Sequence, residues 1–446
     1  MVSNFRIMKK YILLLLSVVF LFSCSDSDET SSPETRQAPL TVMSYFIADN
    51  NLAGDLALNI LHTYEALRQM DEQATYLVYW NGPALGSFEI IKDFISWDKI
   101  RIPNYWETPR ILKYTTDGRG KVNGTSFTLP QKDAASYDTL FKEYAMNVMQ
   151  AAQAVKVYDH QLATDPAVMS QALKDMAAAA PTQRLGLIAG SHGSGWLKYI
   201  AGWNNRSFGQ DGSIDNTMST ASIAGAIKSV GRTFDFMLFD ACMMGCAEVC
   251  YDFKDAVDYM IASPINVPRP GFPYVQMLRH LYTGTEAGYT KACQAYINRY
   301  LNEPSKDIRF GTISLIDCRK MQALADELKP VIVGHKELLS HYDPFEGDDK
   351  LQQFGEKGTN FVGYSFDIID FVRKMENGTV PASLQKVFDE AVLYTGFVPG
   401  VPEYLINAEQ YSGLGLYVPY SRREGWNDYF KTISWYQAAG WDQVPF

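Results

Sequence analysis

Two apolar segments, residues 187–190 and 236–239, constrain the fold of this chain more than any other feature of its sequence. Each has the length of a β-strand, and each is followed at once by a residue that can do chemistry, His192 after the first and Cys242 after the second. Strands that are buried on both faces of a parallel sheet have such uninterrupted apolar sequences, and functional residues gather at their carboxyl ends. We therefore expect His192 and Cys242 to lie side by side as a base and a nucleophile.

The remaining chain favours an α/β fold. Further strand-like segments occur at residues 41–48, 74–79, 257–262 and 309–316. Helical periodicity occurs at residues 52–70, 137–158 and 166–179. This alternation predicts a mostly parallel central sheet with helices on both faces. The last third of the chain lacks the alternation, so we predict a catalytic domain at residues 39–320 and a smaller C-terminal subdomain, residues 321–446, packed on it.

The first 38 residues have the composition of an export signal and a tether. Basic residues precede an apolar segment at residues 11–22, and a serine stands directly before Cys24. This pattern resembles a bacterial lipoprotein, which implies a signal peptide at residues 1–23 and a lipid on Cys24. An uncleaved membrane anchor is the alternative, but about a dozen apolar residues are too few for a bilayer of roughly 30 Å. Residues 24–38 are polar and lack periodicity, as expected for a flexible tether.

The tether and the charge of the chain bear on location and partners. We expect a lipid-anchored protein of the bacterial outer membrane. The acidic residues after Cys24 resemble an export signal of surface lipoproteins, which leaves two orientations open, toward the cell surface or toward the periplasm. The formal net charge is −10, and no Lys/Arg cluster offsets it. Such a surface argues against nucleic acid as a partner and would attract cationic peptides. We expect a monomer that meets the membrane through its lipid.

Three of the six cysteines recur every four residues: Cys242, Cys246 and Cys250. This spacing suggests metal ligands, but no further His or Cys lies nearby to complete a tetrahedral site. Side chains four apart on a helix are also too far apart for an unstrained disulfide. We interpret Cys246 and Cys250 as small buried residues of the core.

The two strand ends together can support acyl transfer. A thiol attacks an amide only as the thiolate, and His192 can take the proton from Cys242 and later protonate the leaving amine. Gly193 has no side chain, so its N–H can approach a developing oxyanion, with the N–H of Cys242 as the second donor. A helix predicted to begin directly after Cys242 would stabilise the thiolate further. The sequence assigns no third partner, so we predict a dyad.

Each residue alone has a structural explanation, because a single Cys at the end of an apolar strand is usually part of the core. Their flanking residues favour catalysis. His-Gly-Ser-Gly-Trp at residues 192–196 and Asp-Ala-Cys-Met-Met-Gly at residues 240–245 resemble the catalytic signatures of the clostripain family of cysteine peptidases. Residues 41–52, 262–274 and 412–419 also resemble segments of that family.

This resemblance implies a caspase-like α/β/α sandwich. One departure is Pro264-Ile265, where family members often have Gln-Glu. It concerns the details of the substrate cleft and not the catalytic pair.

The resemblance also implies a substrate class. The clostripain family cleaves after basic residues, and Asp240 matches the position of its pocket acid. Asp240 stands two residues before Cys242, so strand alternation predicts that the two side chains share one face. The alternative is that Asp240 caps the helix predicted to follow. The resemblance therefore favours a cysteine endopeptidase that cleaves after Arg or Lys.

The same resemblance implies that the protein cleaves itself and suggests that it binds calcium. Family members cut themselves between the catalytic strands, where this chain has a loop containing Arg206 and Ser207. The chemistry requires no cofactor, although calcium could bind at acidic residues such as 346–349 without an EF-hand pattern. A catalytically silent surface-tethered binding protein, or an amidase or transpeptidase using the same acyl-enzyme chemistry, remain alternatives.

Overall fold

The computed structural model describes residues 39–446 except for residues 85, 198–206, 346–349, 356–363 and 400–405. The predictions about residues 1–23, Cys24, residues 24–38, Arg206 and residues 346–349 lie outside this part. Pro39–Phe446 form one compact unit. Within the described ranges no helix has both the length and the apolar sequence needed to cross a membrane.

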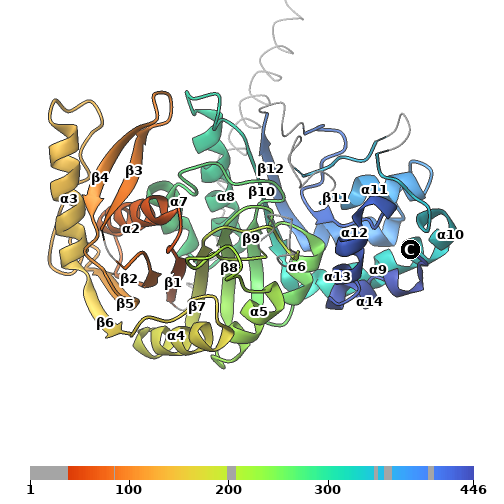
Figure 1. The fold of residues 1–446 in the computed structure, drawn as a ribbon, viewed down its shortest axis with the longest axis horizontal. Helices are drawn as coiled ribbons and strands as arrows, with labels where there is room; N and C mark the ends of the chain where they lie inside the picture. Colours follow the sequence, from red (N-terminus) through yellow and green to blue (C-terminus); the bar gives the residue numbers. More distant parts are fainter. Residues whose placement is uncertain (1–38, 85, 198–206, 346–349, 356–363, 400–405) are drawn as a thin grey trace, which may run out of the picture. The chain divides into compact units, whose positions relative to one another are not determined.

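A nine-stranded sheet runs through this unit in the order β12-β10-β9-β8-β7-β1-β2-β5-β6 (Figure 1). Its strands are β1 (Leu40–Ile47), β2 (Ala74–Asn81), β5 (Arg110–Thr116), β6 (Gln153–Val157), β7 (Arg184–Gly190), β8 (Phe234–Asp240), β9 (Val257–Ala262), β10 (Gly311–Asp317) and β12 (Val392–Val398). The five central strands, β9 to β2, are parallel, and the strands beside them on each side pair antiparallel. Every residue of β1 and β8 is buried, which explains their uninterrupted apolar character.

Helices cover both faces of the sheet and build two separate cores. One core contains α2 (Ala53–Arg68), α3 (Tyr137–Ala151), α7 (Tyr274–Leu281) and α8 (Glu286–Leu301). The other contains α4 (Pro166–Ala179), α5 (Thr220–Lys228), α6 (Ala247–Asp252) and α9 (Met321–Gly334). The predicted α/β/α sandwich with a mostly parallel central sheet is confirmed.

The last third of the chain adds to the second core. It contains α10 (Lys336–Leu339), α11 (Ile368–Met375), α12 (Ala382–Ala391), α13 (Glu424–Phe430) and α14 (Ser434–Ala438), with the small β11 (Phe366–Asp367) and β13 (Gly415–Leu416) pairing with each other. It also supplies β12, which pairs with β10 in the large sheet. The boundary near residue 320 stays a prediction.

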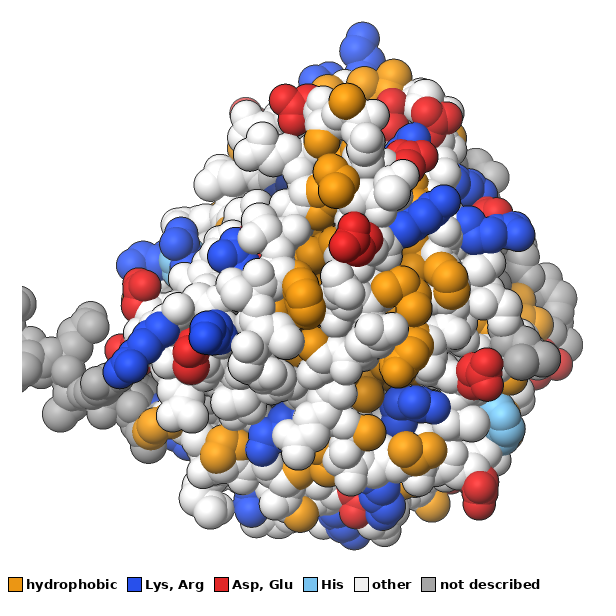
Figure 2. Space-filling view, turned by 90° about the vertical axis from the view of Figure 1, so that its left-hand side faces the viewer, with side chains coloured by type: hydrophobic (Ala, Val, Ile, Leu, Met, Phe, Trp, Pro, Cys, Tyr) orange, Lys and Arg blue, Asp and Glu red, His pale blue; other side chains and the backbone are white. Residues whose placement is uncertain are grey.

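The opposite end of the sheet carries a hairpin of β3 (Ser87–Asp93) and β4 (Asp98–Pro103), and the exposed edge strand β6. The helical periodicity at residues 137–158 was wrong in its last part, since α3 stops at Ala151 and residues 153–157 pair with β5 instead. Figure 2 views this end, where hydrophobic side chains form stripes bordered by charged ones. Val155 and Val157 of β6 are exposed, while Lys156 between them forms an ion pair with Asp175 of α4. A lysine on an edge strand opposes pairing with another chain.

Candidate active site

The two chemically capable residues lie at the ends of adjacent parallel strands. In the register of β7 and β8, Gly190 is opposite Asp240, so His192 and Cys242 each stand two residues beyond one matched pair. Their loops touch, since a Cβ added at Gly193 would lie 2.8 Å from the carbonyl oxygen of Cys242. The structure thus brings together residues that are far apart in the sequence. The sequence predicted that three residues would be neighbours, and all three lie at the carboxyl-terminal edge of the sheet: His192, Gly193 and Cys242.

Cys242 differs from the other cysteines in its exposure. Its side chain is half-buried, whereas the other four cysteines of the described chain are buried and none forms a disulfide. The Cys242 Sγ accepts a hydrogen bond from the N–H of Val267, at 3.4 Å, in the segment after β9. Burial raises the pKa of Cys246 and of Cys250 well above the usual value, so both are held as thiols. Their interpretation as core residues agrees with these positions.

The backbone after Cys242 differs from the prediction. We expected a helix from Met243 onward, but α6 begins only at Ala247, and Met243 has a φ of +59° in a turn. The turn is bound to the segment after β9, because Met243 N–H donates to Ile265 O at 3.0 Å and Gly245 N–H donates to Ser263 O at 2.9 Å. These pairings replace a first helical turn. A helix N-terminus therefore does not stand at Cys242.

The departure from the family pattern lies in this same segment. Ile265 is 1% exposed and packs against Phe354. Ile265, which replaces a polar residue of many relatives, is thus part of the core that supports the turn after Cys242.

Asn51 is the functional candidate that the sequence did not reveal. His192 Nε2 lies 2.6 Å from Asn51 Oδ1 in the turn between β1 and α2. Residues 49–52, Asp-Asn-Asn-Leu, belong to the segment 41–52 that resembles the family, but their sequence does not indicate which asparagine faces the histidine. The His192 loop itself is held by Gly209 N–H, which donates to His192 O at 2.8 Å, and by Ser191 Oγ, which donates to Ile47 O at 2.8 Å.

Asp240 lies beneath the site and is 7% exposed. Its Oδ2 accepts hydrogen bonds from Asn59 Nδ2 at 2.8 Å and from Tyr274 OH at 3.1 Å. The chain crosses directly over it at Gly271, where φ is +97° and a Cβ would lie 2.7 Å from Asp240 Oδ1. Burial raises the pKa of Asp240 to about 7, and the Tyr274 hydrogen bond offsets part of this effect.

Two expectations about Asp240 change with the structure. It does not cap a helix, since the N-cap of α6 is Cys246. In addition, β8 ends at Asp240, so the strand alternation that predicted a shared face does not extend to Cys242 in the following turn. The carboxyl instead faces α2 through Asn59.

The loop between the catalytic strands returns to the site. Ser207 is buried, its Oγ donates to Gly195 O at 3.1 Å, and its carbonyl accepts from Ser194 N–H at 2.9 Å. The expected cleavage bond joins this residue to Arg206, which lies outside the described residues. The described side of that bond is therefore anchored against the His192 loop.

Aromatic residues from the C-terminal third hold the other side of the His192 loop. Trp196 is 1% exposed, its ring stacks with Tyr364 and Tyr429, and its backbone N–H donates to Tyr364 OH at 3.1 Å. Residues after 320 therefore help to position the loop that carries His192.

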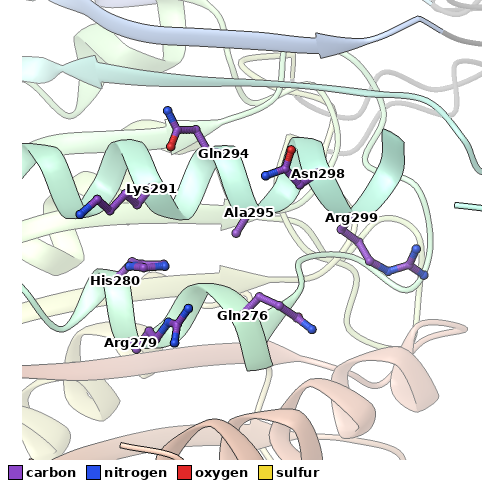
Figure 3. A pocket seen from close by; sticks show the side chains of 8 residues that line it. All are labelled: Gln276, Arg279, His280, Lys291, Gln294, Ala295, Asn298 and Arg299. Carbon is purple, nitrogen blue, oxygen red and sulfur yellow. The ribbon is translucent and has the colours of Figure 1, made fainter. Parts of the chain in front are cut away.

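A separate pocket of about 480 Å³ opens between α7 and α8 (Figure 3). Its lining is basic and polar: Gln276, Arg279, His280, Lys291, Gln294, Ala295, Asn298 and Arg299. Burial lowers the pKa of His280, and the positive charges of Arg279 and Lys291 lower it further. Neither His192 nor Cys242 lines this pocket, so it is distinct from the candidate active site. In the described ranges no group of three His, Cys, Asp or Glu side chains is placed to hold a metal ion.

Comparison with known proteins agrees with the geometry. The sequence model of the clostripain family matches residues 44–444. Clostripain of Hathewaya histolytica is 22% identical over 267 residues, which are 57% of this chain and 44% of that protein. The match thus spans less than half of the length of this curated relative.

Solved structures share the fold. A secreted C11 cysteine protease from Bacteroides thetaiotaomicron, in complex with an irreversible peptide inhibitor, has a TM-score of 0.64 at 20% identity, over 91% of this chain and 100% of that one. An inactive zymogen C11 protease from Parabacteroides distasonis has a TM-score of 0.65 at 22% identity, over 90% of this chain and 98% of that one.

The fold of the chain is that of the C11 cysteine protease structures. The family match over most of its length shows that the chain belongs to the clostripain family. The resemblance drawn from its two motifs is confirmed.

Proposed function

We propose that this chain is a cysteine endopeptidase that cleaves after Arg or Lys, with Cys242 as nucleophile and His192 as its base. The observation that carries the proposal is the contact between the two strand-end loops, where Gly193 packs on the backbone of the half-buried Cys242. Membership of the clostripain family supports the same chemistry.

The reaction follows acyl-transfer chemistry. Cys242 loses its proton to His192, and the thiolate attacks the carbonyl carbon of the scissile bond. The backbone N–H groups of Gly193 and Cys242 stabilise the oxyanion, and His192 returns the proton to the leaving amine. Water then hydrolyses the thioester, with His192 accepting a proton from the water. Cys242 is regenerated for the next cycle.

Substitution of the pair tests the mechanism. Cys242→Ala and His192→Ala should each lower amide hydrolysis by several orders of magnitude, because a covalent pair acts as a unit. A labelled peptide chloromethyl ketone with Arg should attach to Cys242 in wild type and not in Cys242→Ala. His160→Ala, at an exposed histidine, is the control. Undiminished turnover in the Cys242→Ala enzyme would refute the mechanism, and a chain that never labels would favour a binding protein.

Asp240 is proposed to receive the basic side chain of the substrate. Its carboxyl is buried, and its hydrogen-bond partners Asn59 and Tyr274 are neutral. A buried carboxylate is costly without a cation, and a guanidinium or ammonium group of the substrate would supply one. To reach it, the substrate side chain must enter beside the backbone at Gly271.

The protonation state of Asp240 allows its proposed role in binding a basic side chain to be tested by varying the pH. Since its pKa is about 7, the carboxylate is charged above pH 7 and neutral below it, so cationic substrates should bind better as the pH rises through 7. Asp240→Asn should lower kcat/KM for Arg substrates by about 100-fold or more and abolish this pH effect. Uncharged substrates should change little. An equal loss for both substrates would make Asp240 a scaffold residue.

Self-cleavage at the Arg206–Ser207 bond is a further part of the proposal. An enzyme that accepts Arg could cut this bond, and Ser207 is anchored close to the His192 loop. Intact-mass analysis should find two fragments in wild type and one chain in both Cys242→Ala and Arg206→Gln. Single-chain, fully active wild type would exclude self-cleavage as a step in activation.

The proposal also covers attachment to the membrane and dependence on calcium. We propose attachment to the outer membrane through a lipid on Cys24, and one of the similar structures is of a secreted protein. Cys24→Ala should move the protein from the membrane to the soluble fraction. Calcium dependence is tested by activity after chelation and after calcium is restored.

A further inference from the structure

The turn between β1 and α2 places two neighbouring asparagines in different roles. Asn50 holds the turn, since its Nδ2 donates to Ile47 O at 2.9 Å and to Gln210 O at 2.8 Å, and its Oδ1 accepts from Leu52 N–H at 2.8 Å. Asn51 is exposed and directs its Oδ1 to His192 Nε2 at 2.6 Å. The hydrogen bonds of the Asn50 side chain thus hold the turn in the conformation that places the Asn51 side chain next to His192.

We propose that Asn51 is the positioning residue of the catalytic pair. A neutral imidazole carries its proton on one ring nitrogen only, and the partner of that nitrogen selects the tautomer. When Nε2–H donates to Asn51 Oδ1, the proton resides on Nε2 and the lone pair on Nδ1. Nδ1 is then the nitrogen that exchanges the proton with Cys242 and the leaving amine. This inference rests on the proposed peptidase function.

The strand order explains how the contact forms. β1 and β7 are adjacent and parallel, with Phe46 opposite Gly190, so the turn after β1 and the loop after β7 emerge at the same edge. Ser191 Oγ donates to Ile47 O at 2.8 Å, which ties the base of the His192 loop to the base of the Asn51 turn. The hydrogen bond to His192 therefore bridges two segments whose backbones are already joined.

Kinetics of the full chain on a peptide with Arg before the scissile bond tests the role. Asn51→Ala should lower kcat by about 10- to 100-fold, the range for losing one hydrogen bond to a group that becomes charged. KM and Tm should stay near wild type because the side chain is exposed. Asn50→Ala should instead lower Tm. Asn302→Ala, at an exposed asparagine on α8's C-terminal side, is the neutral control.

Asn51→Asp separates positioning from scaffolding. Aspartate keeps the acceptor oxygen and loses the amide donor, so kcat should recover to within about tenfold of wild type. The added carboxylate stabilises the imidazolium, so the limb of the pH profile that reports His192 should move to higher pH. The titratable groups on the surrounding elements, Cys242, Asp240, Asp49 and Asp211, are the same in every variant. A shift confined to Asn51→Asp therefore reports the new charge.

The outcomes separate this inference from the proposed function. Wild-type kcat in Asn51→Ala, or an Asn51→Asp enzyme as slow as Asn51→Ala, would overturn the positioning role. If Cys242→Ala is inactive while Asn51→Ala is fully active, only the positioning role fails. If Cys242→Ala remains active, the proposed function itself fails.

Discussion

Gly193 shows how closely the two halves of the site approach each other. A Cβ at this position would lie 2.8 Å from Cys242 O, 3.0 Å from Ala241 Cβ and 3.1 Å from Met244 Sδ. Two of these neighbours belong to the turn that carries the proposed nucleophile, and a backbone carbonyl cannot move without moving that turn. The absence of a side chain is therefore a steric requirement of the pairing between the two loops.

Gly193→Ala should lower kcat/KM by about 10- to 100-fold, because its methyl group would separate the loops and displace the proposed oxyanion donors. Tm should also fall, because the added methyl group must displace the backbone at Cys242. Gly334→Ala is the matched control, with open space around its Cβ position at the end of α9. Activity of Gly193→Ala equal to that of Gly334→Ala would contradict the close approach.

At the scale of elements, the strand before His192 is shaped by its neighbour. Gly186 in β7 lies opposite Phe236 in β8, and a Cβ at Gly186 would overlap the Phe236 ring. The two strands fix the spacing between the candidate catalytic residues, so packing here sets the geometry at their ends. Gly225 in α5 provides the contrast, because a Cβ added there meets nothing within 4 Å.

Gly186→Ala should destabilise the chain by about 1–3 kcal/mol through overpacking. Gly225→Ala should stabilise it by about 0.5–1 kcal/mol, since alanine loses less backbone entropy than glycine in a helix. Urea unfolding monitored by tryptophan fluorescence measures both. Equal and small effects would show that the Phe236 ring can move aside at little cost.

At the scale of the whole molecule, buried ionisable groups couple stability to pH. Burial raises the pKa of Asp240 and of Glu248 to about 7, and it lowers the pKa of His62 to about 4. The folded chain therefore binds protons at the two acids that the unfolded chain has already released near neutral pH. Below pH 6.5 the unfolded chain binds a proton at His62, whereas His62 of the folded chain stays neutral until the pH approaches 4.

The free energy of unfolding should therefore rise as the pH falls from 8 to 6.5, by about 1–2 kcal/mol for the two acids together. Below pH 6.5, His62 should oppose any further gain. Glu248→Gln should remove about half of the rise, while Glu89→Gln, at an exposed carboxylate, should leave it unchanged. Urea unfolding at pH 8.0 and 6.5 checks the sign, and a fall in stability over this interval would contradict it.

The sequence by itself determined the α/β class and the placement of His192 and Cys242 at the ends of neighbouring strands. Apolar strands and their flanking residues are local signals, and parallel strands bring their ends to one edge. Tertiary structure alone decided that Asn51 faces His192, that Asp240 faces Asn59, and that the backbone after Cys242 forms a turn bound to residues 263–265. Each of these features depends on contacts between segments distant in the sequence. No local pattern encodes which side chain a neighbouring strand end will present.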